Sequence, residues 1–375
     1  MARPLVAEIN LTAVRNNYQL ALNQSITSTV LAVVKANAYG HGAIAVSQAL
    51  ADIAPAFAVA CIEEAEQLVV AGIKKPIVLL EGFFESDELP IIIAKAYEPV
   101  IHSYWQLNEL VSYLKTHPVA DNSLNVWLKV DTGMHRLGFA VEEAESAYKI
   151  IKALPAINTI TLTSHFACAD DLSSAATAQQ LAKFETLQQQ LNCPVSIANS
   201  SATLGWSEAQ HGYLRAGIML YGASPFMSHN GLGEQLQTVM TLKSQLISVR
   251  DLPGEESVGY GARFITSKPT RIGVVACGYG DGYPRHARDG TPMLLNGKKC
   301  YLAGRVSMDM LTVDLTGSPD AKIGDEVILW GEGLPVNEVA NYCDTISYTL
   351  LTGLLPRVPR RYLKNKKLEI VDVCS

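Results

Sequence analysis

The chain has few charged residues, few aromatic residues and no long apolar run. Charged residues make up 18% and aromatic residues 7% of its 375 residues, and the formal net charge is −6. This acidic balance argues against nucleic acid or an anionic membrane as the main partner, since both select a basic face. No stretch reaches the roughly 18 apolar residues of a membrane span, and residues 1–8 hold no apolar leader. We therefore expect a cytoplasmic protein that acts on a small molecule.

Paired cysteines are missing as well. The seven cysteines are odd in number, and none belongs to a C-x-x-C pair. This pattern indicates neither a disulfide framework nor a zinc knuckle, so we expect free thiols and no bound metal. A hydrophobic content of 48% is enough to fill the cores of a large α/β domain and a smaller second one.

Short apolar runs alternate with segments of helical period in the first part of the chain. The helical segments include residues 44–52, 63–71, 141–153 and 178–191. Eight such units over about 200 residues predict a closed (β/α)₈ barrel, and an open doubly wound sheet is the alternative. The expected strands are residues 29–37, 56–62, 77–82, 97–103, 124–131, 159–167, 195–200 and 213–221.

The rhythm changes after residue 221. Residues 224–233 have the composition of a linker, and strand signals with few long helices follow. We expect a barrel domain over residues 12–230 and a mostly β domain over 231–375, which the N-terminal strand 1–11 joins. The expected strands of the second domain are residues 241–252, 271–277, 299–303, 310–315 and 326–330, with short helices at 337–342 and 348–355. Residues 363–375 form either a last strand or a frayed tail.

Lys35 follows the apolar stretch 30–34 and precedes a turn that contains Gly40 and Gly42. An apolar setting strips water from an amine and frees its lone pair, as condensation with an aldehyde requires. The other interpretation is a lysine whose amine reaches past the strand end into water.

Polar residues follow the ends of later strands, on the face where barrel enzymes keep their sites. Lys129 ends the fifth strand, Arg136 follows it, and His165 ends the sixth. These side chains fit either a site or a solvated network of ion pairs and hydrogen bonds.

The seventh and eighth strands end in small residues. Asn199 and Ser200 follow the seventh strand, while Arg215, Gly217 and Ile218 lie on the eighth. Barrels often bind phosphate after these two strands, because free backbone N–H groups are available there. The pattern favours a phosphorylated cofactor.

The run Lys35-Ala36-Asn37-Ala38-Tyr39-Gly40-His41-Gly42 resembles the cofactor-lysine signature of alanine racemases. The other blocks resemble this family one by one, over roughly residues 7–362. The resemblance implies pyridoxal 5'-phosphate as cofactor, interconversion of L-alanine and D-alanine, and a homodimer with shared active sites. The product would serve peptidoglycan synthesis or alanine catabolism.

The resemblance also implies residue roles in the barrel. Lys35 would hold the cofactor and act as the base on one face of the substrate Cα. Arg215 would face the pyridine nitrogen and His165 would stack near the cofactor, with Asn199 in the same cofactor-binding set. Arg136 would lie near the substrate carboxylate, supported by Lys129, which is carbamylated in some members. The phosphate would be held by Tyr39, Ser200, Gly217, Ile218 and Tyr348.

The second domain contributes the block Val258-Gly259-Tyr260-Gly261. A tyrosine between glycines is usually only a turn residue. The resemblance makes Tyr260 the second base, which enters the site of the partner subunit, and makes Tyr279 and Met308 substrate-binding residues. Ser307 departs from the cysteine that many members carry, which leaves the breadth of accepted substrates open.

The chemistry suits two bases. Racemisation needs the proton to return on the opposite face, so Lys35 and Tyr260 on opposite faces are the economical arrangement. Three rivals are a non-catalytic pyridoxal phosphate carrier, an amino-acid decarboxylase of the same fold, and a metal-dependent hydrolase using His41, His165 and Lys129. A carrier needs no second domain, a decarboxylase lacks the Tyr260 and Met308 blocks, and the hydrolase lacks an H-x-H pair on the first strand.

Overall fold

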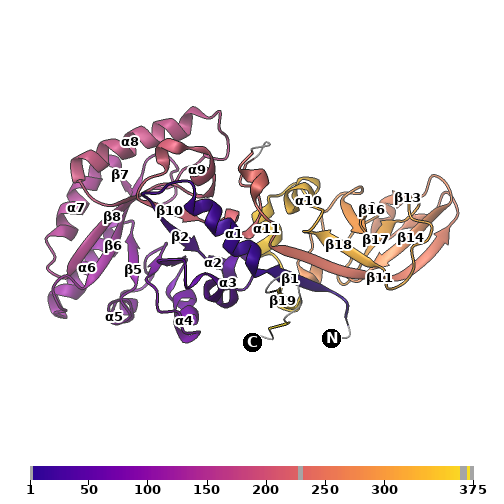
Figure 1. Ribbon diagram of the computed structural model, residues 1–375, viewed down its shortest axis with the longest axis horizontal. Helices are drawn as coiled ribbons and strands as arrows, with labels where there is room; N and C mark the ends of the chain where they lie inside the picture. The colour runs from indigo at the N-terminus through magenta and orange to yellow at the C-terminus, as the bar shows by residue number, and fades with distance from the viewer. Residues whose placement is uncertain (1–2, 227–230, 364–369, 372–375) are drawn as a thin grey trace.

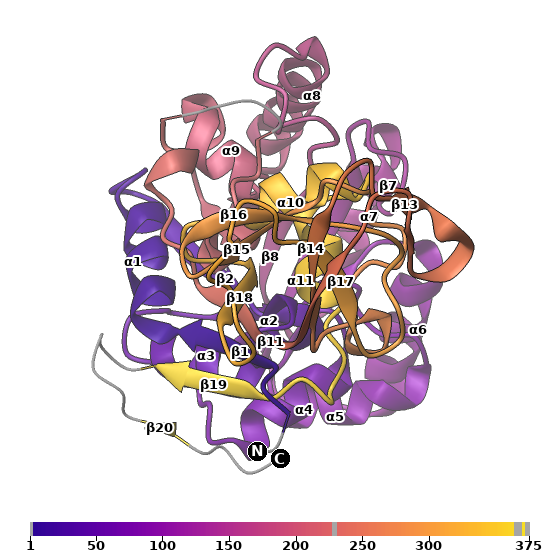
Figure 2. The same cartoon turned by 90° about the vertical axis from the view of Figure 1, so that its right-hand side faces the viewer.

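The structure is a computed structural model that describes residues 3–226, 231–363 and 370–371. Figure 1 shows two bodies, a barrel ringed by helices and a second unit built of strands, with the long strand β11 (Met240–Leu252) reaching away from the barrel. In Figure 2 the molecule is seen from the side of the second unit, whose strands lie in front of the barrel.

The first body is a ring of parallel strands. Within the described residues, eight strands pair in sequence, and β10 returns to pair with β2. The ring is completed beside β9, where the Arg215 N–H donates to the Ala198 carbonyl at 2.9 Å. The (β/α)₈ prediction is therefore confirmed over the open sheet. The strands are β2 (Thr29–Val33), β3 (Phe57–Val59), β4 (Ile77–Leu79), β5 (Glu98–Ile101), β6 (Leu124–Asp131), β8 (Ile157–Thr163), β9 (Val195–Ser196) and β10 (Tyr213–Ala216), and the short β7 (Phe139–Ala140) pairs with β6.

Helices cover the outside of this ring. The longer helices bury an apolar stripe, as in α7, where Ala144, Ala147 and Ile151 are buried at helical spacing. Side-chain caps begin four of them: Asn10, Ser103, Ser174 and Asn199 accept from the N–H groups of Ala13, Gln106, Ala176 and Ala202. The helices of this body are α1 (Leu11–Leu22), α2 (Lys35–Tyr39), α3 (Ala43–Leu50), α4 (Ile62–Val70), α5 (Leu89–Ala94), α6 (Tyr104–Thr116), α7 (Ala144–Lys152), α8 (Ala175–Leu191) and α9 (Ser200–Gly205).

The second body is a closed antiparallel sheet, which confirms the mostly β prediction. Its ring runs through β14 (Thr270–Val275), β17 (Leu311–Asp314), β16 (Lys298–Leu302), β15 (Pro292–Leu295), β18 (Glu326–Trp330) and β11, which pairs again with β14. The same sheet continues through β1 (Val6–Asn10), β19 (Arg360–Leu363) and β20 (Ile370–Val371). A small hairpin, β12 (Ser257–Val258) with β13 (Phe264–Ile265), and two helices, α10 (Val336–Tyr342) and α11 (Ser347–Thr352), complete this body.

Some expected boundaries are wrong. The first strand ends at Val33, not at 37, because Ala36, Asn37, Ala38 and Tyr39 take φ values of 52, 53, 53 and 51° and wind the chain left-handed. The seventh strand ends at Ser196, and the eighth ends at Ala216, where a 3₁₀ turn (Ile218–Tyr221) begins. The side chains of that turn are buried. These residues are therefore apolar because they pack in the core, although they do not continue the strand.

Two expectations fall partly outside the described residues. The domain boundary at 230/231 follows directly on residues 227–230, and residues 364–369 and 372–375 belong to the tail. Within the described ranges no helix combines the length and apolarity that crossing a bilayer requires.

Candidate active site

A cavity of about 630 Å³ opens at the carboxyl ends of the barrel strands. Residues from β2, β5, β6, β8 and β10 and from α2, α9 and α11 meet there, which is the face where barrel enzymes place their sites. Eleven of the predicted site residues line it: Lys35, Tyr39, Lys129, Arg136, His165, Asn199, Ser200, Arg215, Gly217, Ile218 and Tyr348.

Lys35 sits at the start of the left-handed turn that follows β2. The Glu64 carboxylate holds this turn, accepting from the Ala36 N–H at 2.7 Å and from the Ala60 N–H at 2.8 Å. Asn37 Oδ1 accepts from the Ala43 N–H at 2.8 Å and fixes the other end. A left-handed residue other than glycine costs roughly 1–2 kcal/mol, so these contacts offset strain at the point that orients the lysine.

The ends of β9 and β10 form a cradle for an anion. Ser200 Oγ accepts from the Gly217 N–H at 2.9 Å. A Cβ on Gly217 would lie 2.8 Å from the Tyr39 hydroxyl, so only glycine leaves this space open. The ring centroids of Tyr39 and Tyr348 are 5.9 Å apart, and burial raises the pKa of Tyr39 to about 12. Neutral phenols beside backbone N–H groups are donors that suit a phosphate.

Arg215 is a buried cation, with 6% of its surface exposed. Burial lowers its pKa to about 10, which leaves it protonated at neutral pH. All the groups that it contacts are uncharged: Ser196 Oγ at 2.6 Å, Thr163 Oγ1 at 3.3 Å, the carbonyls of Ser164 at 2.7 Å and Ile197 at 3.2 Å, and His165 Nδ1 at 3.2 Å. Its charge is thus left to act on an anion or a ring placed in the cavity.

His165 is held neutral by its surroundings. Burial, then the charges of Arg215 and Arg136, keep its pKa well below 6.5. Because an arginine has no acceptor, the 3.2 Å contact with Arg215 makes Nδ1 the acceptor and leaves the ring proton on Nε2.

Lys129 and Arg136 complete the positive lining. Burial, then Arg215, Arg136 and Lys35, lower the pKa of Lys129 to about 8. The loop before Arg136 is fixed by Asp131, whose Oδ1 accepts from the N–H groups of Gly133, Met134 and His135 at 2.9, 3.0 and 3.0 Å. Arg136 itself is exposed at the mouth, where it can meet an incoming carboxylate.

The second body holds the other three predicted residues outside this cavity. Tyr260 is 69% exposed, Tyr279 36% and Met308 54%, each on or beside a short turn. One chain therefore does not bring them to its own Lys35.

The comparisons with known proteins decide the family. A model of the alanine racemase N-terminal domain matches residues 9–225, and one of the alanine racemase C-terminal domain matches residues 239–362. The chain belongs to the alanine racemase family. The alanine racemase of Chromohalobacter salexigens is 55% identical to it over 96% of this chain and 98% of that protein. A catabolic alanine racemase of Pseudomonas aeruginosa is 50% identical over 96% and 99%.

Solved structures of the alanine racemase family share both bodies. A biosynthetic alanine racemase from Pseudomonas aeruginosa superposes with a TM-score of 0.93 at 46% identity, covering 96% of this chain and all of the other. An alanine racemase from Bartonella henselae, with covalently bound pyridoxal phosphate, gives 0.88 at 30% identity over 96% and 99%. The chain is thus an enzyme of this family.

Sequence reasoning missed several residues of this racemase cavity. Glu81, Trp127 and Thr163 line it, and Glu64 holds the Lys35 turn from outside. Trp127 and Thr163 lie within predicted strands, but alternation alone does not show which residues face the inside of a ring. Nothing in its local pattern marks Glu64. No cluster of metal-ligand type occurs among the described residues.

Proposed function

We propose that this protein is an alanine racemase that interconverts L-alanine and D-alanine with pyridoxal 5'-phosphate. The observation that carries the proposal is the meeting of Lys35, the cradle at Ser200 and Gly217, and the buried Arg215 around one cavity. An amine, an anion cradle and a fixed cation are the three groups that a phosphorylated aldehyde cofactor requires.

The residues present fit this cofactor. The space kept open by Gly217 adjoins two phenols and the Ser200 hydroxyl, which would hold the phosphate. Lys35 would hold the aldehyde carbon, and Arg215 would face the ring nitrogen beside His165. When bound, the cofactor supplies a conjugated ring that accepts the electron pair left on the substrate Cα.

The protein residues then handle charge and proton. Arg136 binds the substrate carboxylate at the mouth, with Lys129 beside it. Lys35 takes or returns the Cα proton on one face, and Tyr260 does so on the other. Arg215 would donate a hydrogen bond to the ring nitrogen but holds its own proton too tightly to transfer it, so the ring would be a weaker electron acceptor than one with a protonated nitrogen.

The second base comes from another chain in this proposal. Tyr260, Tyr279 and Met308 are exposed in one chain, and the cavity of that chain lacks them. A homodimer in which each second domain covers the partner's barrel would supply all three. A two-fold axis makes both sites complete at once.

The cellular setting follows from less specific observations. The six cysteines that the structure describes are free, which supports a reducing cytoplasm. A relative named biosynthetic and one named catabolic are 46% and 50% identical to this chain. The proposal therefore concerns the reaction, which could serve D-alanine synthesis or alanine catabolism.

The rival functions have less support. A carrier would use the barrel alone, whereas the second racemase domain is matched over residues 239–362. The curated relatives at 50–55% identity are named racemases and not decarboxylases.

Product analysis tests the reaction. The purified protein with L-alanine should yield D-alanine on a chiral column until the two are equal. Borohydride should fix the cofactor on Lys35 and abolish activity. An adduct mapped to Lys129, or release of carbon dioxide in place of D-alanine, would contradict the proposal.

Subunit exchange tests the shared site. Lys35→Ala and Tyr260→Phe homodimers should each be nearly inactive, but a mixed dimer contains one site with both bases intact. Random exchange should therefore restore about a quarter of all sites, from symmetry alone. Labelling shows whether the subunits have exchanged. If they have exchanged and activity still does not return, the sites are not shared.

A further inference from the structure

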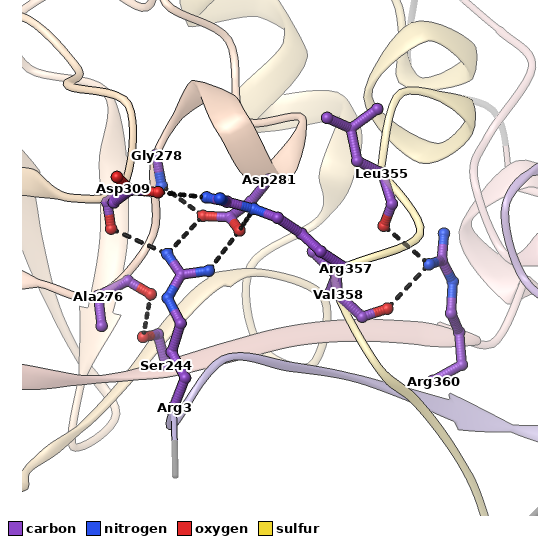
Figure 3. Close-up of polar contacts among 10 residues, drawn as sticks. All are labelled: Arg3, Ser244, Ala276, Gly278, Asp281, Asp309, Leu355, Arg357, Val358 and Arg360. Carbon is purple, nitrogen blue, oxygen red and sulfur yellow. Dashed lines mark hydrogen bonds and ion pairs between the residues drawn. The ribbon is translucent and has the colours of Figure 1, made fainter. Parts of the chain in front are cut away.

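A buried carboxylate in the second body joins two arginines from distant parts of the chain. Asp281 is fully buried, and its two oxygens accept from Arg3 at 2.5 and 2.7 Å and from Arg357 Nε at 2.7 Å. The Gly278 N–H donates to the same carboxylate at 2.8 Å. Figure 3 shows both guanidinium groups converging on Asp281 from opposite sides.

The same arginines also hold a neighbouring turn. Arg357 Nη2 donates to Asp309 Oδ1 at 2.6 Å, and Arg3 Nη2 donates to the Asp309 carbonyl at 2.9 Å. Two arginines and two aspartates make a cluster with no net charge. Such a cluster is satisfied only while all members keep their places, because one lost partner leaves a buried carboxylate under-compensated.

The two aspartates of this cluster belong to the same turns as two of the proposed substrate residues. Tyr279 and Asp281 share one 3₁₀ turn, and Met308 precedes Asp309. The two turns are also joined by backbone bonds, from the Tyr279 N–H to the Ser307 carbonyl at 3.0 Å and from the Gly280 N–H to the Met308 carbonyl at 2.8 Å. A Cβ at Gly278 would lie 2.3 Å from the Ser307 carbonyl, so the turns meet with no space between them.

Hydrogen bonds also link the cluster to segments beside the cavity of its own chain. The Asp281 carbonyl accepts from the Leu355 N–H at 3.0 Å, just after the helix that carries Tyr348. Arg360 donates to the carbonyls of Leu355 and Val358 at 3.0 and 2.8 Å, and its Nε reaches the Gly40 carbonyl at 3.2 Å. Gly40 follows the left-handed turn that begins at Lys35.

We propose that Arg3, Asp281, Arg357 and Asp309 form a positioning unit that fixes Tyr279 and Met308 for the substrate pocket of the partner subunit. The inference rests on the proposed function, since the substrate contacts of Tyr279 and Met308 are themselves part of it. None of the four residues lines the cavity of its own chain, so each acts through the turns that it holds.

The test uses the cofactor-loaded dimer and the variant Arg3→Gln. Arg3 is 36% exposed, and glutamine keeps the first carbons of the side chain and a polar end but loses the reach, the charge and the paired donors. We expect KM for alanine to rise about tenfold in both directions, as displacement of a binding residue does, with kcat changed less than about threefold. The cofactor absorbance should stay as in the parent. Arg3→Lys, which keeps the charge, should show a smaller rise in KM than Arg3→Gln.

Arg15→Gln is the matched control. Arg15 makes the same two-pronged pair, to Asp52 at 2.5 and 2.9 Å, and is 39% exposed, but it joins α1 to residues after α3, away from both turns. KM for this variant should stay at the parent value. Equal KM in Arg3→Gln and Arg15→Gln would overturn the proposal. Should Arg3→Gln not fold, Asp309→Asn, at a residue 51% exposed, should raise KM about threefold, and an unchanged KM there would overturn it too.

Two purified mixed dimers, marked by different C-terminal tags, separate this proposal from the shared site. Pairing an Arg3→Gln chain with a Lys35→Ala chain leaves one working site, whose Tyr279 and Met308 come from the chain with intact Arg3. Its KM should be that of the parent. Pairing an unmodified chain with a Lys35→Ala/Arg3→Gln chain should give the raised KM.

The opposite pattern, a raised KM in the first pair alone, would show that the sites are not shared while Arg3 still positions the pocket of its own chain. A parent KM in both pairs would overturn the positioning role and leave the shared site standing.

Discussion

The two halves of the proposed site are built in opposite ways. The barrel half is packed into one cavity, with Arg215 buried and Ser200 already bonded to the Gly217 N–H. The half on the second body carries Tyr260 at 69% exposure and Met308 at 54%. In the proposed function, the difference means that one folded chain already assembles the groups that would hold the cofactor, whereas the far face of the substrate would depend on a second chain.

Their charges differ as well. The barrel half gathers Lys35, Lys129, Arg136 and Arg215 around one cavity, with Glu81 as the acid among its lining residues. The second half offers two phenols and a thioether. Cations attract a phosphate and a carboxylate, and in the proposed function the second half would handle a proton and shape the pocket around a small side chain.

The largest expected effect lies in the exposed half. Tyr260→Phe should lower kcat about 10³-fold, because a positioned acid or base is worth 10²–10⁴-fold. Its melting temperature should not change, since the hydroxyl is on an exposed side chain. Tyr301→Phe, at another exposed tyrosine of the same body, is the control and should keep full activity. A loss of stability in Tyr260→Phe would break the contrast between the halves.

Arg215→Glu tests the buried half. A carboxylic acid in place of the arginine can protonate the ring nitrogen, so racemisation should fall and transamination should rise as a fraction of turnovers. Loss of the buried contacts should also lower the free energy of unfolding by about 3 kcal/mol. Both are measured by product analysis and urea unfolding, with the exposed Arg250→Glu as control. An unchanged partition between the two reactions would remove Arg215 from the choice of reaction.

Acid should weaken the barrel half in particular. Burial lowers the pKa of His41 from 6.5 to about 4. Between those values the unfolded chain binds a proton that the folded chain does not, so the stability is complete above pH 6.5 and is lost as the pH falls toward 4.

The size of this effect can be measured with His41→Gln. From pH 6.5 to 5 the parent should lose about 2 kcal/mol through His41 alone, and the variant should lose that much less. Buried His165, whose pKa is also lowered, acts in the same direction, so some acid loss remains. Parallel curves for parent and variant in urea unfolding would contradict the assignment to His41.

The smallest effect concerns backbone strain beside Lys35. Ala36 has a φ of 52° and is exposed, so Ala36→Gly should raise the free energy of unfolding by up to about 1 kcal/mol. Ala182→Gly, at an exposed position in the right-handed helix α8, should lower it by about 0.5–1 kcal/mol. Changes of the same sign in thermal unfolding would show that the left-handed turn carries no strain.

The sequence predicted the barrel well because its strands are short runs buried on both faces, such as Thr29–Val33. The prediction failed where the backbone changes conformation but the type of residue stays the same. Residues 36–39 look like a continuing strand but wind left-handed. The strand β15 (Pro292–Leu295) was not predicted, because it begins with a proline.

For the site, residue pattern alone indicated an amine, a few cations and a phosphate cradle. The three residues of the second body came from family resemblance, since a tyrosine between glycines has no chemical signal of its own. The ion pair between Arg3 and Asp281 joins residues 278 positions apart, and no local pattern can show such a pairing.

The placement of β1 has a consequence for synthesis of the chain. This strand is made before the barrel, yet its partners are β11, which starts only at Met240, and β19, which follows still later. At 5–20 residues per second the ribosome needs about 10–50 s to reach β11. During that time Val6–Asn10 has no strand to pair with while the barrel beside it assembles, and the unpaired N–H and C=O groups of such a strand invite pairing with other chains. The nascent chain is thus vulnerable at β1 until β11 has been made, and slower translation prolongs that exposure.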